Sequence, residues 1–103
     1  MQVLTINYVP GKEIEPIGIV TGNVVQSKHI GKDIMAGLKN IAGGELKSYT
    51  EMLSESREIA IQRMVAEAQA LGADAIICMR FDASSVMDGT SEMLAYGTAV
   101  KFL

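Results

Sequence analysis

The sequence predicts a single α+β domain, in which a small, mostly antiparallel sheet packs with one long and one short helix. Three observations predict this class: a helix with clear start and stop signals, a β-rich hairpin after it, and two β-rich runs before it. The chain has 103 residues, enough for one hydrophobic core and too few for two. Residues 1–103 are therefore expected to form one domain.

Two β-rich runs come first in the chain. Val3 to Tyr8 is followed by Pro10-Gly11, a pair that is typical of turns. Ile17 to Ser27 is the next predicted strand, and alternation places Gly18 and Gly22 on the same face. Two glycines on one face indicate a bend or the close approach of another element.

Two helices are expected next. A short one should follow Gly31, because apolar residues recur at helical spacing until Gly43-Gly44. The long helix is predicted from Ser48, which begins a capping-box sequence, to Leu71, after which Gly72 supplies a left-handed cap. Its apolar stripe is wide enough to cross a sheet and also touch a neighbour. The stripe consists of Leu53, Ala60, Ile61, Met64, Val65, Ala68 and Leu71.

The segment from Asp74 to Phe102 predicts a long hairpin centred on an Asp88-Gly89 turn. The expected facing pairs are Phe81 with Tyr96, Ile77 with Val100, and Ala75 with Phe102. One face should hold the core residues Ala75, Ile77, Met79 and Phe81, and the other should place Cys78, Arg80 and Asp82 over Ala99, Gly97 and Ala95. We expect another subunit to cover the second face. The same expectation applies to the paired glycines and to the wide helix stripe.

Composition limits the classes of partner. A net charge of -3 and a pI near 5.0 provide no electrostatic footprint for nucleic acid or for an anionic membrane. No apolar run approaches the roughly 20 residues that span a bilayer, and the N-terminus does not resemble a signal peptide. We therefore expect neither nucleic acid nor membrane as a partner. The single cysteine fits a reducing, cytoplasmic location.

Metal binding is the sharpest candidate chemistry. Cys78 is the only thiol and His29 the only imidazole, whereas a zinc site needs three or four converging ligands. A site that uses them would have to combine ligands from more than one chain. The alternatives are a buried, inert thiol for Cys78 and a solvated residue at a strand end for His29.

The arginines offer a second candidate chemistry. Arg57, Arg63 and Arg80 could form structural ion pairs or an anion clamp. Arg80 is expected to lie opposite Gly97 and to pair with a carboxylate such as that of Asp82. The motifs of serine hydrolases, zinc proteases and P-loop proteins are absent, so an enzyme is not expected.

A family resemblance rests on residues spread over the second part of the chain. These are Gly43-Gly44-Glu45, Tyr49, Arg57, Ala60, Arg63, Ala68, and the segments 71–76, 80–82 and 95–100. Through them the chain resembles the YbjQ family of small bacterial and archaeal proteins, which are often labelled heavy-metal-binding. The resemblance runs from about Leu4 to the C-terminus. It implies a dodecin-like subunit, a ring-shaped homo-oligomer of five chains, and a divalent or soft metal ion as cofactor.

These observations lead to one main functional expectation. The protein should be a cytoplasmic, non-enzymatic homo-oligomer that binds a metal ion or small ligand at a subunit interface or in the ring's centre. The candidate ligand or interface residues are Glu45, Tyr49, Arg57, Arg63, Arg80 and Asp82, and the candidate metal ligands are Cys78 and His29. Two alternatives stay open: a purely structural scaffold without a ligand, and an enzyme with an interfacial site.

Overall fold

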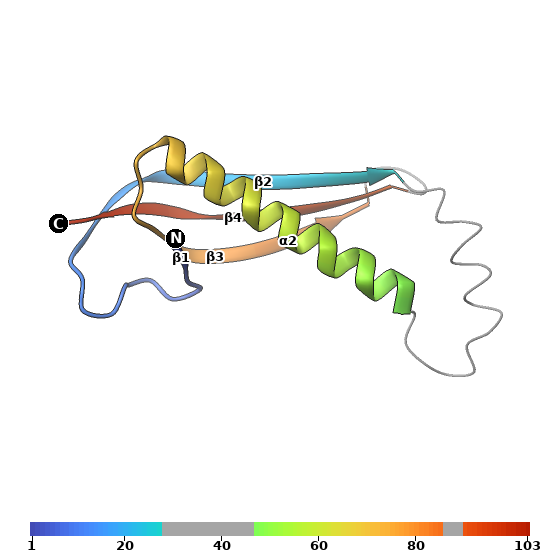
Figure 1. Cartoon of the computed structure of the whole chain (residues 1–103), viewed down its shortest axis with the longest axis horizontal. Helices are drawn as coiled ribbons and strands as arrows, with labels where there is room; N and C mark the ends of the chain where they lie inside the picture. Colours follow the sequence, from blue (N-terminus) through green and yellow to red (C-terminus); the bar gives the residue numbers. More distant parts are fainter. Residues whose placement is uncertain (28–46, 86–89) are drawn as a thin grey trace.

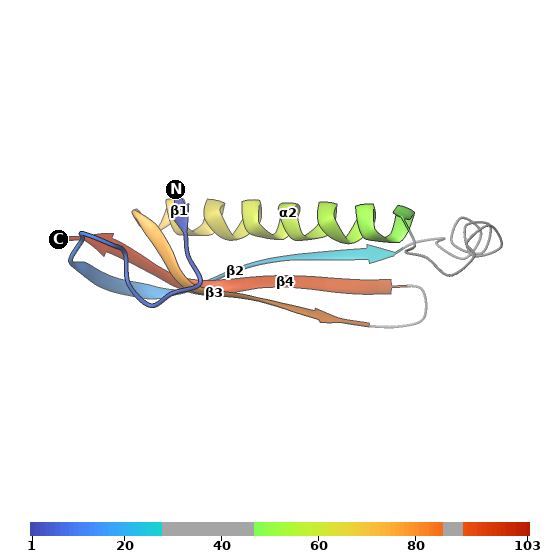
Figure 2. The same cartoon turned by 90° about the horizontal axis from the view of Figure 1, so that it is seen from below.

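The computed structural model describes residues 1–27, 47–85 and 90–103. Its elements are β1 (Gln2–Val3), β2 (Ile14–Ser27), α2 (Lys47–Ala70), β3 (Ala75–Ser84) and β4 (Thr90–Phe102). The strands form one sheet in the order β1-β3-β4-β2, and α2 lies along one face of it (Figures 1 and 2). The predicted α+β class is confirmed. The expected short helix and the Asp88-Gly89 turn lie outside the described residues.

The sheet is mixed rather than wholly antiparallel. β1 pairs with β3 in parallel, while β4 pairs antiparallel with both β3 and β2. The predicted first strand is much shorter than expected, since only Gln2–Val3 joins the ladder. The turn at Pro10-Gly11 is confirmed, because the Lys12 N–H donates to the Val9 carbonyl at 3.1 Å. In the part of the chain that the structure describes, no helix has the length and hydropathy needed to cross a bilayer.

The predicted register of the hairpin is wrong. The structure pairs Ala75 with Val100, Ile77 with Thr98, Arg80 with Tyr96, Phe81 with Ala95 and Asp82 with Leu94. Between Ile77 and Arg80 the register shifts, so that Cys78 and Met79 stand together opposite Gly97. This is a β-bulge, and the residues of β3 before and after it follow opposite alternations.

The N-terminal segment holds the bulge from one side. The N–H groups of Cys78 and Met79, although consecutive, both point to this segment and donate to the carbonyls of Ile6 at 2.9 Å and Leu4 at 3.0 Å. Cys78 has a φ of 53°, a left-handed conformation that is uncommon for a residue with a side chain. The bulge therefore depends on contacts between segments far apart in the sequence.

Gly97 accommodates the bulge from the other side. A Cβ at this position would lie 2.7 Å from Cγ2 of Ile76 and 3.0 Å from the carbonyl oxygen of Ile77. Both distances are too short for an ordinary carbon contact, so a side chain does not fit here. Gly97 thus allows Ile76 to pack across β4.

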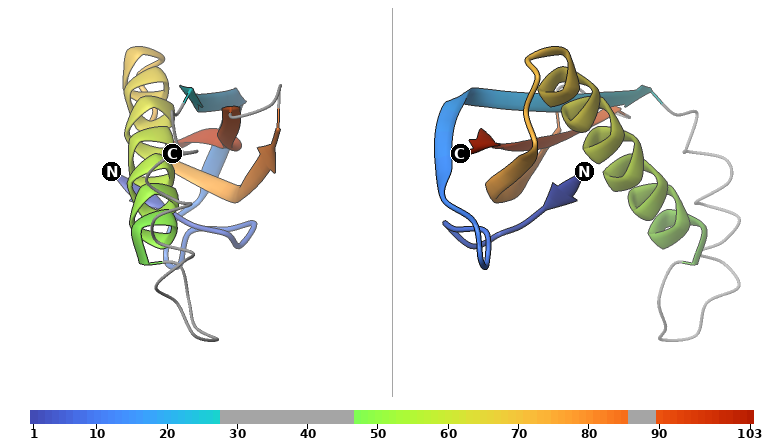
Figure 3. Two further views of the ribbon diagram at one scale, coloured as in Figure 1. Left: turned by 90° about the vertical axis from the view of Figure 1, so that its right-hand side faces the viewer. Right: turned by 60° about the vertical axis from the view of Figure 1, so that its left-hand side comes forward.

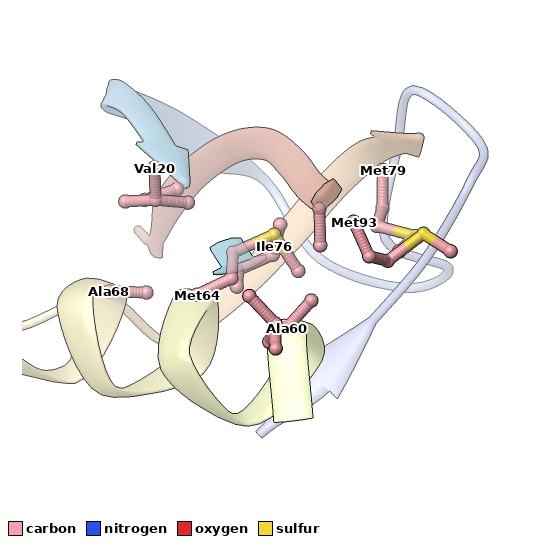
Figure 4. Packing of buried hydrophobic residues seen from close by; sticks show 10 residues of the cluster. Val20, Ala60, Met64, Ala68, Ile76, Met79 and Met93 are labelled. Atoms are coloured by element: carbon pink, nitrogen blue, oxygen red, sulfur yellow. The ribbon is translucent and has the colours of Figure 1, made fainter. Parts of the chain in front are cut away.

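The bulge divides the apolar residues of β3 between the two faces of the sheet. The main core lies under α2 and contains Val20, Val24, Ala60, Met64, Ala68, Ile76, Met79, Met93, Ala95 and Ala99 (Figure 4). A smaller cluster on the opposite face contains Val9, Ala75, Ile77 and Val100. The predicted single core face is wrong, because the bulge moves Met79 to the face of Ile76. Phe81, expected in the core, is 40% exposed.

The small residues of β4 serve the core of their own chain. Ala95 and Ala99 are fully buried under α2, and Gly97 lies between them on the same face. The expectation that these residues form a surface facing another subunit is therefore wrong. Neither Arg80 nor Asp82 lies over them.

Helix α2 packs on the sheet through every fourth residue, which forms one ridge along its surface. The buried residues of this ridge are Met52, Ser56, Ala60, Met64 and Ala68. The predicted stripe is confirmed at its centre but not at Leu71, which is half-exposed. Figure 3 shows the helix on one side of the twisted strands.

The end of α2 matches the prediction. Gly72 has a φ of 76°. Its N–H donates to the Gln69 carbonyl, and the Ala73 N–H donates to the Ala68 carbonyl, both at 3.0 Å. This is the Schellman arrangement that satisfies the last carbonyls of a helix. The predicted capping side chain of Ser48 lies outside the described side chains.

Gly22 is the point of closest contact between α2 and the sheet. A Cβ on Gly22 would collide with the carbonyl oxygen of Ala60 and the backbone nitrogen of Met64. The close approach predicted from paired glycines is confirmed here. At Gly18 nothing lies within 4 Å of the same position, and a register shift lies between Pro16 and Gly18.

Replacing Gly22 by alanine should destabilise the fold, because the added methyl group meets helix backbone that cannot rotate away. We expect the free energy of unfolding, measured by urea denaturation, to fall by about 1–3 kcal/mol. Gly18→Ala is the matched control on the same strand and should change it by less than about 0.5 kcal/mol. Equal effects of the two variants would contradict the helix contact.

Candidate functional site

The face of the sheet opposite α2 is the candidate functional surface, and we call it the open face. Register and alternation assign to it Ile19, Thr21, Asn23 and Val25 of β2, Glu92, Leu94, Tyr96 and Thr98 of β4, and Arg80, Asp82 and Ser84 of β3. Ile19 is 76% exposed and Val25 54%. Apolar side chains therefore meet solvent beside charged ones on this face.

Glu92 lies between two polar neighbours on the open face. Its carboxylate accepts hydrogen bonds from Oγ of Ser84 at 3.5 Å and from Nδ2 of Asn23 at 3.4 Å. The three residues come from β3, β4 and β2, so the carboxylate spans the sheet. Both bonds are long, which leaves the carboxylate oxygens able to accept a cation or a further donor. No sequence pattern singles out Glu92, because only the true register sets it opposite Ser84.

Arg80 holds the chain's own backbone. Its Nη1 donates to the carbonyl of Thr5 at 2.9 Å and to that of Met79 at 2.8 Å. The guanidinium thereby ties the N-terminal segment to the bulge in β3. The expected position opposite Gly97 is wrong, since Arg80 pairs with Tyr96. Its recorded partners are carbonyls rather than the expected carboxylate.

The two helix arginines lie on the other side of the sheet. Nη1 of Arg63 donates to the carbonyl of Asn23 at 2.7 Å, which joins α2 to β2. Nη2 of Arg57 donates to Oγ of Ser54 within the helix at 3.1 Å. The predicted ligand or interface residues that the structure describes are therefore divided between two faces. Of these, only Arg80 and Asp82 share the open face. Glu45 and the side chain of Tyr49 lie outside the described residues.

The predicted metal ligands do not meet within the described ranges. Cys78 is half-buried and packs against the smaller hydrophobic cluster, and His29 lies outside the described residues. No group of three or more His, Cys, Asp or Glu side chains gathers in residues 1–27, 47–85 and 90–103.

Asp82 and Glu92 are diagonal neighbours on the open face, because Asp82 pairs with Leu94. They offer two oxygen donors of the kind that hard divalent cations bind.

Sequence comparison relates the chain to one family. The model of the YbjQ_1 family, described as "Putative heavy-metal-binding", matches residues 1–103. A UPF0145 protein of Vibrio campbellii is 64% identical over 100 residues, which cover 96% of each chain. A UPF0145 protein of Fervidobacterium nodosum is 63% identical over 102 residues, which cover 98% of this chain and 94% of that protein.

A solved structure shows the same fold. It is the crystal structure of a protein of unknown function from Pediococcus pentosaceus that belongs to the DUF74 family. The two structures superpose with a TM-score of 0.71 over 100% of this chain and 98% of the other, at 16% sequence identity. At this identity the likeness concerns the fold alone.

Replacing Arg80 by methionine should loosen the bulge, because the carbonyls of Thr5 and Met79 both lose a charged donor. We expect a loss of stability of about 1 kcal/mol, since the guanidinium is partly exposed. The amides of Cys78 and Met79 should also exchange hydrogen faster, as measured by NMR. Arg57→Met is the control and should leave both quantities nearly unchanged. Unaltered exchange in the Arg80 variant would show that the bulge does not depend on this side chain.

Proposed function

This chain belongs to the YbjQ family, and on that premise we propose that it is a homo-oligomeric binding protein. In this proposal identical subunits form a ring, five in number as the family resemblance implies, and hold a metal ion or small ligand between neighbouring chains. The observation that carries it is the open face, where exposed apolar side chains lie beside Arg80, Asp82 and Glu92. We propose a cytoplasmic protein without enzymatic activity.

The exposed apolar side chains of the open face support assembly. Among the described residues, α2 covers one face of the sheet, and the N-terminal segment covers only the part of the other face around Ala75, Ile77 and Val100. Ile19 and Val25 stay exposed on that face. A neighbouring subunit is a natural cover for them.

A metal site built from the described residues needs more than one chain, because no complete ligand group occurs among them. Two copies of the open face would supply four carboxylates from Asp82 and Glu92. Cys78 and His29 are the soft donors that a heavy metal prefers, and they would also have to come from separate subunits. The family description is what favours a metal over another small ligand.

A scaffold without a ligand is the second candidate. The observation in its favour is that Arg63 and Arg80 bind backbone carbonyls of their own chain. Both are residues that the family resemblance rests on, and both stabilise the subunit. An enzyme with an interfacial site ranks last, because the sequence contains no recognisable nucleophile and base pair.

Metal binding can be tested on protein purified without a metal-affinity tag. Native mass spectrometry and elemental analysis should show an oligomer that takes up zinc, nickel or copper(I) in a fixed ratio to its subunits. Combining Asp82→Asn with Glu92→Gln should weaken uptake of zinc or nickel roughly tenfold or more, whereas copper(I) prefers sulfur donors. Glu67→Gln, which changes an exposed carboxylate on α2, is the control and should leave uptake unchanged.

Two results would decide against this reading. An oligomer that binds none of the three metals would exclude a site for them and favour the scaffold. Uptake that survives the double substitution but is lost in Cys78→Ser or His29→Ala would move the site from the open face to the soft ligands.

A further inference from the structure

β2 is a long edge strand, and most of its length carries no charged residue. In the order β1-β3-β4-β2, the described residues give this strand a neighbour on one side only. The run from Ile17 to Ser27 contains no Asp, Glu, Lys or Arg. Natural proteins usually protect such an edge by charge, proline, a bulge or a covering element, because an unprotected edge recruits another strand. Here Pro16 and the adjacent bulge lie only at the start of the strand.

The direction of the backbone groups in β4 follows from the ladder. The Met79 N–H points away from β4, toward the Leu4 carbonyl. Backbone groups alternate in direction along a strand, so the N–H and C=O groups of Arg80 point toward β4. They bond to the backbone of Tyr96, the residue with which Arg80 pairs. The backbone N–H and C=O groups of Ala95 and Gly97, which flank Tyr96 in β4, must then point toward β2.

The same alternation identifies the free groups of β2. Gly22 and Val20 pair with Ala95 and Gly97, so they bond inward to β4. The backbone groups that point away from β4, at the outer edge of β2, belong to Ile19, Thr21, Asn23 and Val25. Nη1 of Arg63 reaches the Asn23 carbonyl, which agrees with an outward direction. The other outward N–H and C=O groups form no backbone–backbone hydrogen bond with another described residue.

β3 carries a second free edge. Beyond Met79 the alternation directs the backbone groups of Phe81 and Ala83 away from β4. β1 ends at Val3, and the described part of the chain offers Phe81 and Ala83 no backbone partner. β2 and β3 both run antiparallel to β4, and therefore parallel to each other.

We propose that the outer edge of β2 pairs with the outer edge of β3 in a second copy of this chain. This inference rests on the proposed homo-oligomer and names the surface that builds it. A rotation about an axis along the strands brings the two edges together as a parallel pair and joins the sheets of neighbouring subunits. Each contact uses one edge of each kind, so a closed ring leaves neither edge free. Pairing of β2 with β2 would leave the β3 edge uncovered.

Residue-resolved amide hydrogen exchange on the intact oligomer tests this pairing. The Thr21, Asn23 and Val25 amides should exchange within about tenfold of the Gly22 and Val24 amides, which bond to β4. The amides of Phe81 and Ala83 should be similarly slow. In an unpaired edge, the outward amides would exchange at least a hundredfold faster than Gly22.

Each other outcome has a defined meaning. An oligomer with fast outward amides in β2 overturns the pairing but leaves the proposed homo-oligomer standing. Slow amides in β2 with fast ones at Phe81 and Ala83 indicate β2–β2 contact and also overturn it. A monomer in native mass spectrometry removes the proposed oligomer and this inference together.

Thr21→Pro provides an independent test. Proline removes the outward N–H of Thr21 and places its ring on the free edge, but no bond to β4 is lost. We expect the oligomer to dissociate at micromolar concentration while the circular dichroism spectrum keeps its helix and strand signals. Thr21→Val keeps the N–H and should remain assembled. A folded Thr21→Pro protein of unchanged oligomeric mass would overturn the proposal.

Discussion

The contact between Gly22 and the backbone of α2 determines how the helix and the sheet pack together. It brings the helix so close to β2 that Ala60 and Met64 become fully buried. The helix is thereby committed to one face, and Arg63 reaches across to the Asn23 carbonyl at the sheet's edge. Among the described residues, α2 is the helix that packs on the sheet and it covers one face, so the open face and two strand edges stay exposed.

The features predicted well from sequence are those with local causes. The cap at Gly72 depends on the conformation of one residue, and the alternation in β2 depends on its own side chains. The register of the hairpin could not be predicted, because the bulge at Cys78 is held by the distant N-terminal segment. That one extra residue reverses the alternation and puts Arg80 opposite Tyr96.

The candidate site was predictable only in part for the same reason. Alternation in the sequence places Asp82 on the same face as Arg80, as in the structure, but the position of Glu92 beside them depends on the true register. The partners of Arg63 and Arg80 are backbone carbonyls, which residue types do not reveal. The small residues of β4 suggested a subunit contact and instead lie beneath α2, so the case for assembly now rests on the open face and the strand edges.

In the proposed assembly, this chain completes its structure only with further copies of itself. Light scattering between one and one hundred micromolar measures the mass of the particle in solution. We expect a constant mass that is a multiple of the 11.0 kDa chain, five-fold for the proposed ring. A mass equal to that of the single chain throughout this range would contradict it.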